Sequence, residues 1–214
     1  MIKHLSAILF FYFLIIIHVF TQNNTENKIQ TDYNDKMVGF LIEYLEIKYP
    51  NYSFDNFIYV GVTRQKLYLI KNKKIFLSYN VSTSKYGAGI INNSNMTPVG
   101  LHEVYEKYGS QVPLGGIFKY REYTGEIAEI NNGKTSTNKD IISSRIITMK
   151  GLEFGLNKGE NIDSHQRNIY IHGTNEEGLI GTPASHGCIR MNNKDVINLY
   201  GYVEKKMLIV ILNN

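Results

Sequence analysis

From residue 57 onward, short runs of β-branched and aromatic residues alternate with turn residues. Such runs predict β-strands, because these side chains fit a pleated, half-buried surface. The Lys71-Asn72-Lys73 segment predicts a hairpin turn between two of them. Many strands with little helix between them predict a mainly β sandwich or barrel-like sheet. The predicted strands cover residues 57–62, 66–70, 74–81, 100–105, 141–149, 168–171 and 206–212.

Two segments follow a helical period instead. Before Pro50, a three- and four-residue spacing predicts a short amphipathic helix that packs on the domain. Its positions are Met37, Phe40, Leu41, Tyr44, Leu45 and Lys48. Asn192 and Asp195 stand at N-cap and N3 spacing before an apolar run that reaches Tyr200. They predict the start of a second helix.

Near the N-terminus, one lysine, Lys3, is followed by an apolar run from Leu5 to Phe20. Sixteen residues match the core of a signal peptide better than a full membrane span. We therefore expect residues 1–22 to form a signal peptide. Retention as a membrane anchor through residues 5–20 is the alternative, because no clear small-x-small cleavage site follows.

Residues 23–55 consist of a polar tether followed by the first helix. The tether buries too little apolar surface to offset its ordering entropy.

A later segment carries little apolar periodicity. Lys107 to Lys139 is rich in glycine and lacks sustained periodicity apart from Gly115–Tyr120. A segment of this length in a compact domain predicts a functional loop or lid. An irregular surface excursion without a role is the alternative.

Composition and charge then narrow the class of protein. The 214 residues are 43% hydrophobic, enough to bury the core of one domain of ordinary size. The formal net charge of +4 is too small and too evenly spread to indicate nucleic-acid binding, so we expect no nucleic-acid partner.

Cys188 is the single cysteine, sixteen residues after His172 and two after His186. Exported proteins use most of their cysteines in pairs, so an unpaired thiol near two histidines predicts a nucleophile. A small buried hydrophobe is the bland alternative. A metal site formed by these three residues is weaker still, because no fourth ligand or metal-binding spacing accompanies them. We expect no metal and no organic cofactor.

Four segments together resemble one family. Ile171-His172-Gly173-Thr174, followed by Ser185-His186-Gly187-Cys188-Ile189-Arg190-Met191, resembles the active-site signature of the L,D-transpeptidase catalytic domain (YkuD-like). Val81-Ser82-Thr83-Ser84-Lys85 resembles its Ser-Thr-Gly-Lys strand end with Ser84 in place of glycine, and Thr97-Pro98-Val99-Gly100 matches its Thr-Pro-x-Gly turn. The resemblance covers roughly residues 56–212. It implies a β-rich fold with one or two short helices and a loop over the cleft.

The resemblance also implies roles for the catalytic residues. It assigns the base to His172, with the backbone carbonyl of Gly173 orienting the imidazole. His186 then shapes the turn before Cys188. Gly187 permits that turn because it has no Cβ, and the backbone N–H groups of the turn are the expected donors to an oxyanion.

Arg190 and Ser185 are the expected substrate-binding residues. The planar guanidinium of Arg190 suits the free carboxylates of peptidoglycan stem peptides, and a structural salt bridge is the alternative. Ser185 is expected to fix the motif by hydrogen bonding. Asp163, His165 and Arg167 could form a charged wall of the cleft, but a solvated loop is the preferred interpretation.

The resemblance implies an exported peptidoglycan L,D-transpeptidase of the periplasm or cell envelope. Cys188 would attack the carbonyl of the third residue of a tetrapeptide stem, and an amine of another stem would resolve the thioester. With water as acceptor, the same site would give an L,D-carboxypeptidase or L,D-endopeptidase. A non-catalytic wall-binding protein is a more distant alternative. The expected partners are stem peptides, and the expected state is a monomer.

Overall fold

The computed structural model describes residues 35–214, which form two compact units divided after Tyr52. The segment expected to be a signal peptide or anchor, and most of the expected tether, lie outside these residues. Within residues 35–214, no helix has both the length and the hydropathy that a membrane span requires.

In the first unit, residues 35–48 are helical, as the spacing predicts. The buried side chains are Val38, Ile42 and Leu45, whereas Phe40 and Tyr44 are exposed. The predicted face was therefore right for Leu45 and wrong for Phe40 and Tyr44. Counting Tyr44 and Lys48 as members of the apolar face rotated it away from the i, i+4, i+7 row that is buried.

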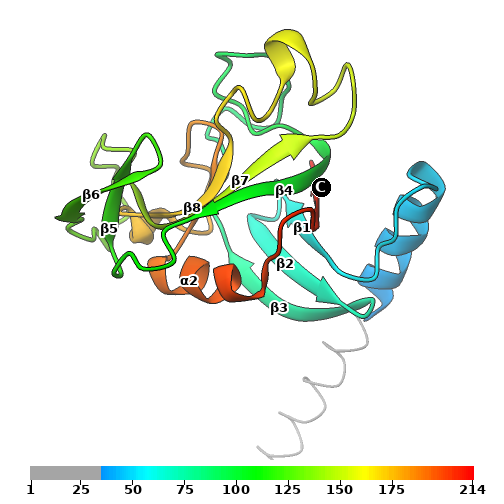
Figure 1. The fold of residues 1–214 in the computed structure, drawn as a ribbon, viewed down its shortest axis with the longest axis horizontal. Helices are drawn as coiled ribbons and strands as arrows, with labels where there is room; N and C mark the ends of the chain where they lie inside the picture. Colours follow the sequence, from blue (N-terminus) through cyan, green and yellow to red (C-terminus); the bar gives the residue numbers. More distant parts are fainter. Residues whose placement is uncertain (1–34) are drawn as a thin grey trace, which may run out of the picture. The chain divides into compact units, whose positions relative to one another are not determined.

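The second unit is built on one ten-stranded sheet, shown in Figure 1, so the mainly β class is confirmed. Hydrogen bonding runs in the order β3-β2-β1-β10-β4-β7-β5-β6, and β8 joins β7 while β9 joins β8. The β1–β10 and β8–β9 pairs are parallel, and the other pairs are antiparallel. The strands are β1 Phe57–Gly61, β2 Lys66–Lys71, β3 Lys74–Asn80, β4 Gly100–Tyr108, β5 Gly116–Lys119, β6 Glu122–Ile127, β7 Ile142–Gly151, β8 Tyr170–Thr174, β9 Ile189–Met191 and β10 Leu208–Leu212.

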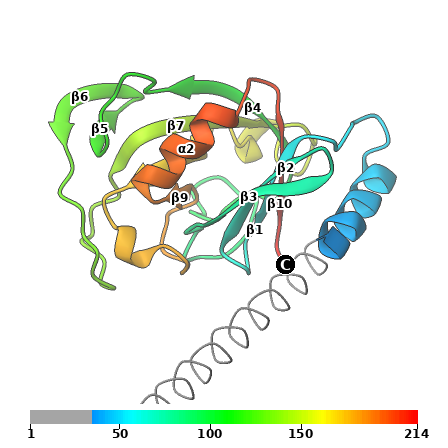
Figure 2. The same cartoon turned by 90° about the horizontal axis from the view of Figure 1, so that it is seen from below.

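One α-helix, α2 (Asn193–Tyr202), packs on β7, as Figure 2 shows, and on β8. Asn192 is its N-cap residue, as the sequence predicts, but its side chain makes no capping hydrogen bond to the backbone. Its Nδ2 donates to Asp195 Oδ2 at 3.2 Å instead. The N–H of Asn193 donates to Glu177 Oε1 at 2.7 Å. A carboxylate from outside the helix therefore accepts from one of the free backbone N–H groups at the N-terminus of α2. Two short 3-10 helices, Glu160–Ile162 and Glu177–Leu179, complete the unit.

The main core lies between the sheet and α2. Ile58 on β1, Leu69 on β2, Ile147 on β7 and Leu199 on α2 are fully buried in one cluster. Each such side chain contributes about 1.5–3 kcal/mol when it leaves water. This cluster fixes β8 and β9, the two strands that carry the candidate chemistry.

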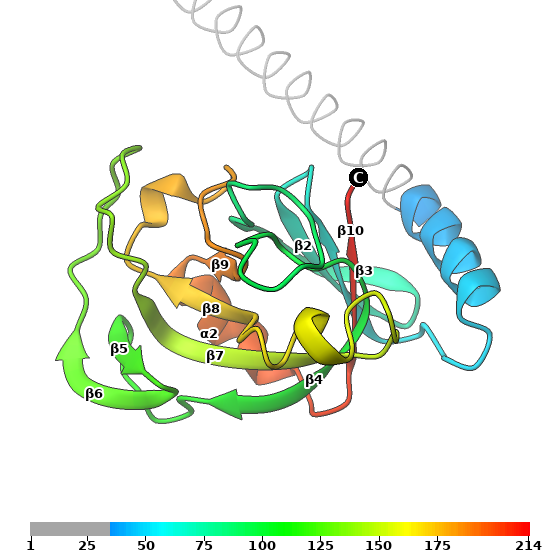
Figure 3. The same cartoon turned by 90° about the horizontal axis from the view of Figure 1, so that it is seen from above.

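The segment expected to be a loop, residues 107–139, contains the hairpin of β5 and β6, seen at one end of the sheet in Figure 3. Every residue of β6 is exposed, so no apolar alternation marks it in the sequence. The three-residue strand β9 was also missed, because the motif around Cys188 has no strand period of its own. β8 begins two residues later and ends three residues later than predicted.

Candidate active site

Cys188 directly precedes β9, and its partly exposed side chain packs against Phe118, Ile146 and Tyr170. Its Sγ donates to the carbonyl of Asn168 and accepts from the N–H of Tyr170, each at 3.4 Å. The sulfur is therefore held against the chain that leads into β8. Among the contacts of the described residues, none is a hydrogen bond between Sγ and His172.

The surroundings of the sulfur favour the neutral thiol. Burial raises the pKa of Cys188 to about 12, and the carboxylate of Asp140 acts in the same direction. The Tyr170 N–H and the charges of Arg190 and Arg167 oppose this rise. A thiol in this state needs a base that accepts its proton before it can act as a nucleophile.

His172 is buried on β8, and the register sets it beside Arg190 on β9. Its Nδ1 lies 2.7 Å from the carbonyl oxygen of Gly173. A carbonyl only accepts, so Nδ1 carries the proton and Nε2 keeps its lone pair. Burial lowers the pKa of His172, although Asp140 and the Gly173 carbonyl act against this shift. The imidazole is thus neutral and ready to accept a proton.

Gly173 has no room for a side chain. A Cβ at this position would lie 2.6 Å from Asn193 Oδ1 and 2.7 Å from the Ser143 carbonyl oxygen. Contacts that short do not occur in folded proteins, so any larger residue would displace β8. The close packing therefore fixes the carbonyl that orients His172.

The turn before Cys188 depends on Gly187, whose φ is +121°. This backbone conformation favours glycine. Ser185 Oγ donates to the Cys188 carbonyl at 2.6 Å and accepts from the Gly187 N–H at 3.2 Å. Thr97 Oγ1 donates to the Gly187 carbonyl at 2.9 Å. Ser185 is thus buried inside the motif, and the Gly187 N–H, one of the expected oxyanion donors, is already engaged.

The upstream segment of the resemblance pairs with the cysteine motif. Ser82 and Arg190 exchange two backbone hydrogen bonds of 2.9 Å, and the Lys85 N–H donates to the Ser185 carbonyl at 3.1 Å. The Ser84 N–H donates to Thr97 Oγ1 at 3.0 Å. These residues, distant in the sequence, therefore support the turn that presents Cys188.

Arg190 is only 2% exposed. Its Nη2 lies 2.7 Å from Asp140 Oδ1, and its Nη1 lies 2.9 Å from Glu176 Oε2. The other oxygen of Asp140 accepts from His186 Nδ1 at 2.8 Å. Burial would raise the pKa of Asp140, but the charge of Arg190 holds it below its usual value. This geometry favours the salt-bridge alternative for Arg190, and its role in binding a substrate carboxylate stays a prediction.

Glu176 ties the segment before β7 to this ion-pair group. Its Oε1 accepts from the hydroxyls of Ser136 at 2.9 Å and Thr137 at 2.8 Å, and from the Thr137 N–H. Neither Glu176 nor Asp140 was found by sequence reasoning. No spacing relates either residue to the cysteine motif, so only the fold shows that they meet Arg190.

Arg167 is half-buried, and its guanidinium donates to the carbonyls of Ile90 at 3.1 Å and Met96 at 2.6 Å. A solvated loop is therefore the wrong interpretation for this residue. Asp163 accepts from the His165 N–H at 2.9 Å, so it serves the local turn. Of the three, Arg167 is the residue whose charge acts on Cys188.

Sequence reasoning also missed a group of side chains on the two residues that hold the sulfur. Tyr170 Oη donates to Asn168 Oδ1 at 2.8 Å. Arg121 Nε donates to Tyr170 Oη at 2.9 Å, and its Nη2 donates to Asn168 Oδ1 at 2.8 Å. The backbones of Asn168 and Tyr170 hold Cys188 Sγ, so this group joins the β5–β6 turn to the nucleophile.

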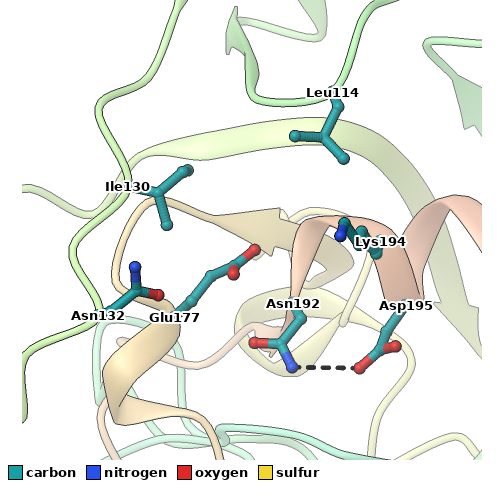
Figure 4. Close-up of a pocket in the computed structure, with 7 residues that line it drawn as sticks. All are labelled: Leu114, Ile130, Asn132, Glu177, Asn192, Lys194 and Asp195. Atoms are coloured by element: carbon teal, nitrogen blue, oxygen red, sulfur yellow. Dashed lines mark hydrogen bonds between the residues drawn. The ribbon is translucent and has the colours of Figure 1, made fainter.

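Two pockets lie on either side of the 3-10 helix Glu177–Leu179. One, of about 350 Å³, includes Asp140, His186 and Arg190 in its wall. The other, of about 410 Å³, lies at the start of α2, and Figure 4 shows Glu177 directed into it. Its lining residues are Leu114, Ile130, Asn132, Glu177, Asn192, Lys194 and Asp195. No group of three His, Cys, Asp or Glu side chains within residues 35–214 is placed to hold a metal ion.

Cys188, one residue before β9, and His172, on the neighbouring strand β8, thus lie on adjacent segments of one mixed sheet. The family model of the L,D-transpeptidase catalytic domain (YkuD) matches residues 55–211. The chain therefore belongs to the L,D-transpeptidase catalytic domain family.

Individual relatives match less of the chain. A 33-residue stretch is 61% identical to YkuD of Bacillus subtilis (strain 168), covering 15% of this chain and 20% of that protein. An L,D-transpeptidase from Xylanimonas cellulosilytica DSM 15894 is 15% identical with a TM-score of 0.43, over 76% of this chain and 63% of that one. An L,D-transpeptidase from Mycobacterium smegmatis is 12% identical with a TM-score of 0.46, over 74% and 58%. The chain thus spans less than two thirds of each.

Proposed function

We propose that this protein is a peptidoglycan L,D-transpeptidase that works through a thioester on Cys188. The family assignment supports the reaction class. The observation that carries the mechanism is the 2.7 Å contact between His172 Nδ1 and the Gly173 carbonyl. It leaves Nε2 as a proton acceptor on β8, the strand that pairs with the one directly after Cys188.

In the acylation step, Sγ turns from the Asn168 carbonyl toward His172 and gives its proton to Nε2. The sulfur then forms a bond to the carbonyl carbon of the third stem residue. The oxyanion accepts hydrogen bonds from backbone N–H groups of the turn before Cys188, apart from the Gly187 N–H, which Ser185 engages. His172 returns the proton to the leaving amine, the C–N bond breaks, and terminal D-alanine departs.

In the second step, an amine of another stem attacks the thioester. His172 accepts a proton from that amine, and the C–S bond breaks as the new amide forms. The proton then returns to sulfur, so the thiol is regenerated. Water in place of the amine would complete a carboxypeptidase or endopeptidase reaction, because acylation is common to all three.

The decisive experiment incubates purified disaccharide-tetrapeptide with the protein and identifies products by mass. A cross-linked dimer with loss of D-alanine supports the transpeptidase, whereas a free tripeptide alone supports the hydrolytic alternative. A carbapenem should add covalently to the wild type and not to Cys188→Ala, a variant that should remain folded. Turnover by Cys188→Ala would refute the cysteine mechanism.

The two histidines provide a matched comparison. His172→Ala should slow acylation by roughly two to four orders of magnitude, in line with general-base catalysis. His186→Ala should have a smaller effect, because His186 is half-exposed and bonded to Asp140. Acylation rates by mass spectrometry, with circular dichroism as the folding control, test this order. A larger loss from His186→Ala would reverse the assignment.

Arg190 tests the balance between structure and recognition. If its ion pairs with Asp140 and Glu176 are its main role, Arg190→Lys should lower the melting temperature and leave near-normal kinetics in the folded fraction. A direct contact with a substrate carboxylate would lower kcat/KM even where stability is kept. Melting curves and stem-peptide kinetics on the same preparation separate the two.

Export, action in the periplasm or cell envelope on stem peptides, and a monomeric state belong to the same proposal. The apolar run at residues 5–20 is the feature that supports export. Cell fractionation with N-terminal sequencing of the mature protein would separate a cleaved signal peptide from a retained anchor.

A further inference from the structure

The tip of the β5–β6 hairpin adopts a costly backbone conformation. Tyr120 and Arg121 have φ values of +51° and +70°. Turns of this kind prefer Asn-Gly or Asp-Gly, and a bulky residue in the left-handed region costs roughly 1 kcal/mol or more. Strained positions concentrate at functional sites, where surrounding contacts maintain them.

The contacts of Arg121 explain where its side chain is held. Its guanidinium donates to Tyr170 Oη and Asn168 Oδ1 and lies 5.5 Å from the centre of the Tyr170 ring. The Tyr108 hydroxyl is a further neighbour. All these groups are neutral, and no carboxylate of the described residues forms an ion pair with Arg121. Its positive charge is therefore not neutralised by the protein.

The position of this charge relative to the nucleophile follows from its partners. Asn168 and Tyr170 are the two residues whose backbone groups hold Cys188 Sγ. The guanidinium is thus bonded to the side chains of both residues that contact the sulfur.

The other two arginines around Cys188 differ from Arg121 in their partners or in the element that carries them. Arg190 is buried between Asp140 and Glu176. Arg167 is half-buried and donates to backbone carbonyls. Arg121, by contrast, lies on a hairpin whose second strand is exposed throughout, so this hairpin adds little to the core. The hairpin thus places a partly exposed cation on the side chains of the two residues whose backbone groups hold Cys188 Sγ.

We propose that Arg121 binds a free carboxylate of the peptide substrate and so holds the scissile carbonyl over Cys188. This inference rests on the proposed function and names a recognition residue for it. A guanidinium binds carboxylate through two parallel N–H bonds, which fixes orientation as well as position. A purely structural Arg121 would only fasten the hairpin to Tyr170 and Asn168.

The first test uses substrates. The tetrapeptide is compared with analogues in which each free carboxylate is amidated in turn, for the wild type, Arg121→Gln and Lys119→Gln. Lys119 ends β5 in the same hairpin, so its variant removes an equal charge. Amidation of the recognised carboxylate should lower wild-type kcat/KM about ten- to a hundredfold, as expected for a charged hydrogen bond. Arg121→Gln should lose that discrimination, and Lys119→Gln should keep it.

The second test does not depend on the proposed function. Cys188 is alkylated with iodoacetate, which is anionic, and with iodoacetamide, its neutral analogue. An unneutralised Arg121 should favour iodoacetate, so Arg121→Gln should lower the ratio of the two rates severalfold while Lys119→Gln leaves it nearly unchanged. An unchanged ratio in Arg121→Gln, or an equal loss of kcat/KM on every substrate analogue, would overturn the proposal. If no peptide is turned over, the proposed function fails and the alkylation ratio alone decides the role of Arg121.

Discussion

Two hairpins of this protein share a turn geometry and differ in almost everything else. The β2–β3 hairpin turns at Asn72 and Lys73, with φ values of +51° and +61°. The β5–β6 hairpin turns at Tyr120 and Arg121 with similar angles. Strand β2 has four buried residues, whereas all six residues of β6 are exposed. The first hairpin builds the core, and the second extends to the neighbourhood of Cys188.

The turn residues reflect this division. Asparagine adopts the left-handed region readily, because its short polar side chain bonds locally. Tyrosine and arginine do not, so the second turn gives up stability to place its side chains. A hairpin that adds little to the core can carry such a strain, provided that contacts such as those of Arg121 hold it in place.

The largest effect that separates the hairpins is a core truncation. Leu69 on β2 is fully buried. Leu69→Ala should lower the free energy of unfolding by about 2–5 kcal/mol, through lost burial and the cavity left behind. Thr124→Ala on the exposed β6 should change it by no more than about 0.5 kcal/mol. Urea unfolding of both variants measures the difference. Similar losses would contradict the conclusion that the β2–β3 hairpin builds the core and that β6 adds little to it.

A buried histidine also predicts that the free energy of unfolding depends on pH. His102 on β4 is buried, with Nδ1 3.1 Å from the Gly100 carbonyl and Nε2 2.9 Å from Ser164 Oγ. Burial lowers its pKa from 6.5 to about 4. The unfolded chain therefore binds this proton more readily, and stability present above pH 6.5 is lost as the pH falls toward 4. The loss should be about 3 kcal/mol.

The matched variant for this prediction is His102→Gln. It should lower stability at neutral pH but flatten the slope of unfolding free energy between pH 6.5 and 4. A residual slope of the same sign is expected from His172, whose pKa is also lowered by burial. Urea titrations at several pH values give the slopes. An unchanged slope in His102→Gln would assign the dependence to other groups.

The smallest effect is a reciprocal exchange of turn residues. Tyr120 is 89% exposed, so Tyr120→Asn should relieve strain and raise the free energy of unfolding by about 1 kcal/mol. Asn72→Tyr in the core hairpin should lower it by a similar amount. Thermal melts of the two variants test the symmetry. A loss of stability in Tyr120→Asn would show that Tyr120 is held by contacts rather than strained.

Sequence reasoning succeeded where a residue's role depends on near neighbours. The strands from β1 to β3 were predicted because their apolar residues face a core and follow a strand period. The mainly β class followed from the same pattern. The family resemblance came from residues close together around Cys188 and His172, whose order the sequence states directly. The helix at residues 35–48 was predicted as an element, although its buried face was not.

Only the tertiary structure decided which distant groups meet. Asp140 and Glu176 neutralise Arg190, and this pairing changed the expected role of a residue that the motif had singled out. Strand β6 has no buried face, so it left no pattern to find. The neutral thiol of Cys188 likewise depends on burial and on the carboxylate of Asp140, which comes from a distant segment. Local periodicity encodes strands that bury their own side chains, whereas charge pairing and desolvation arise only when separate segments are brought together.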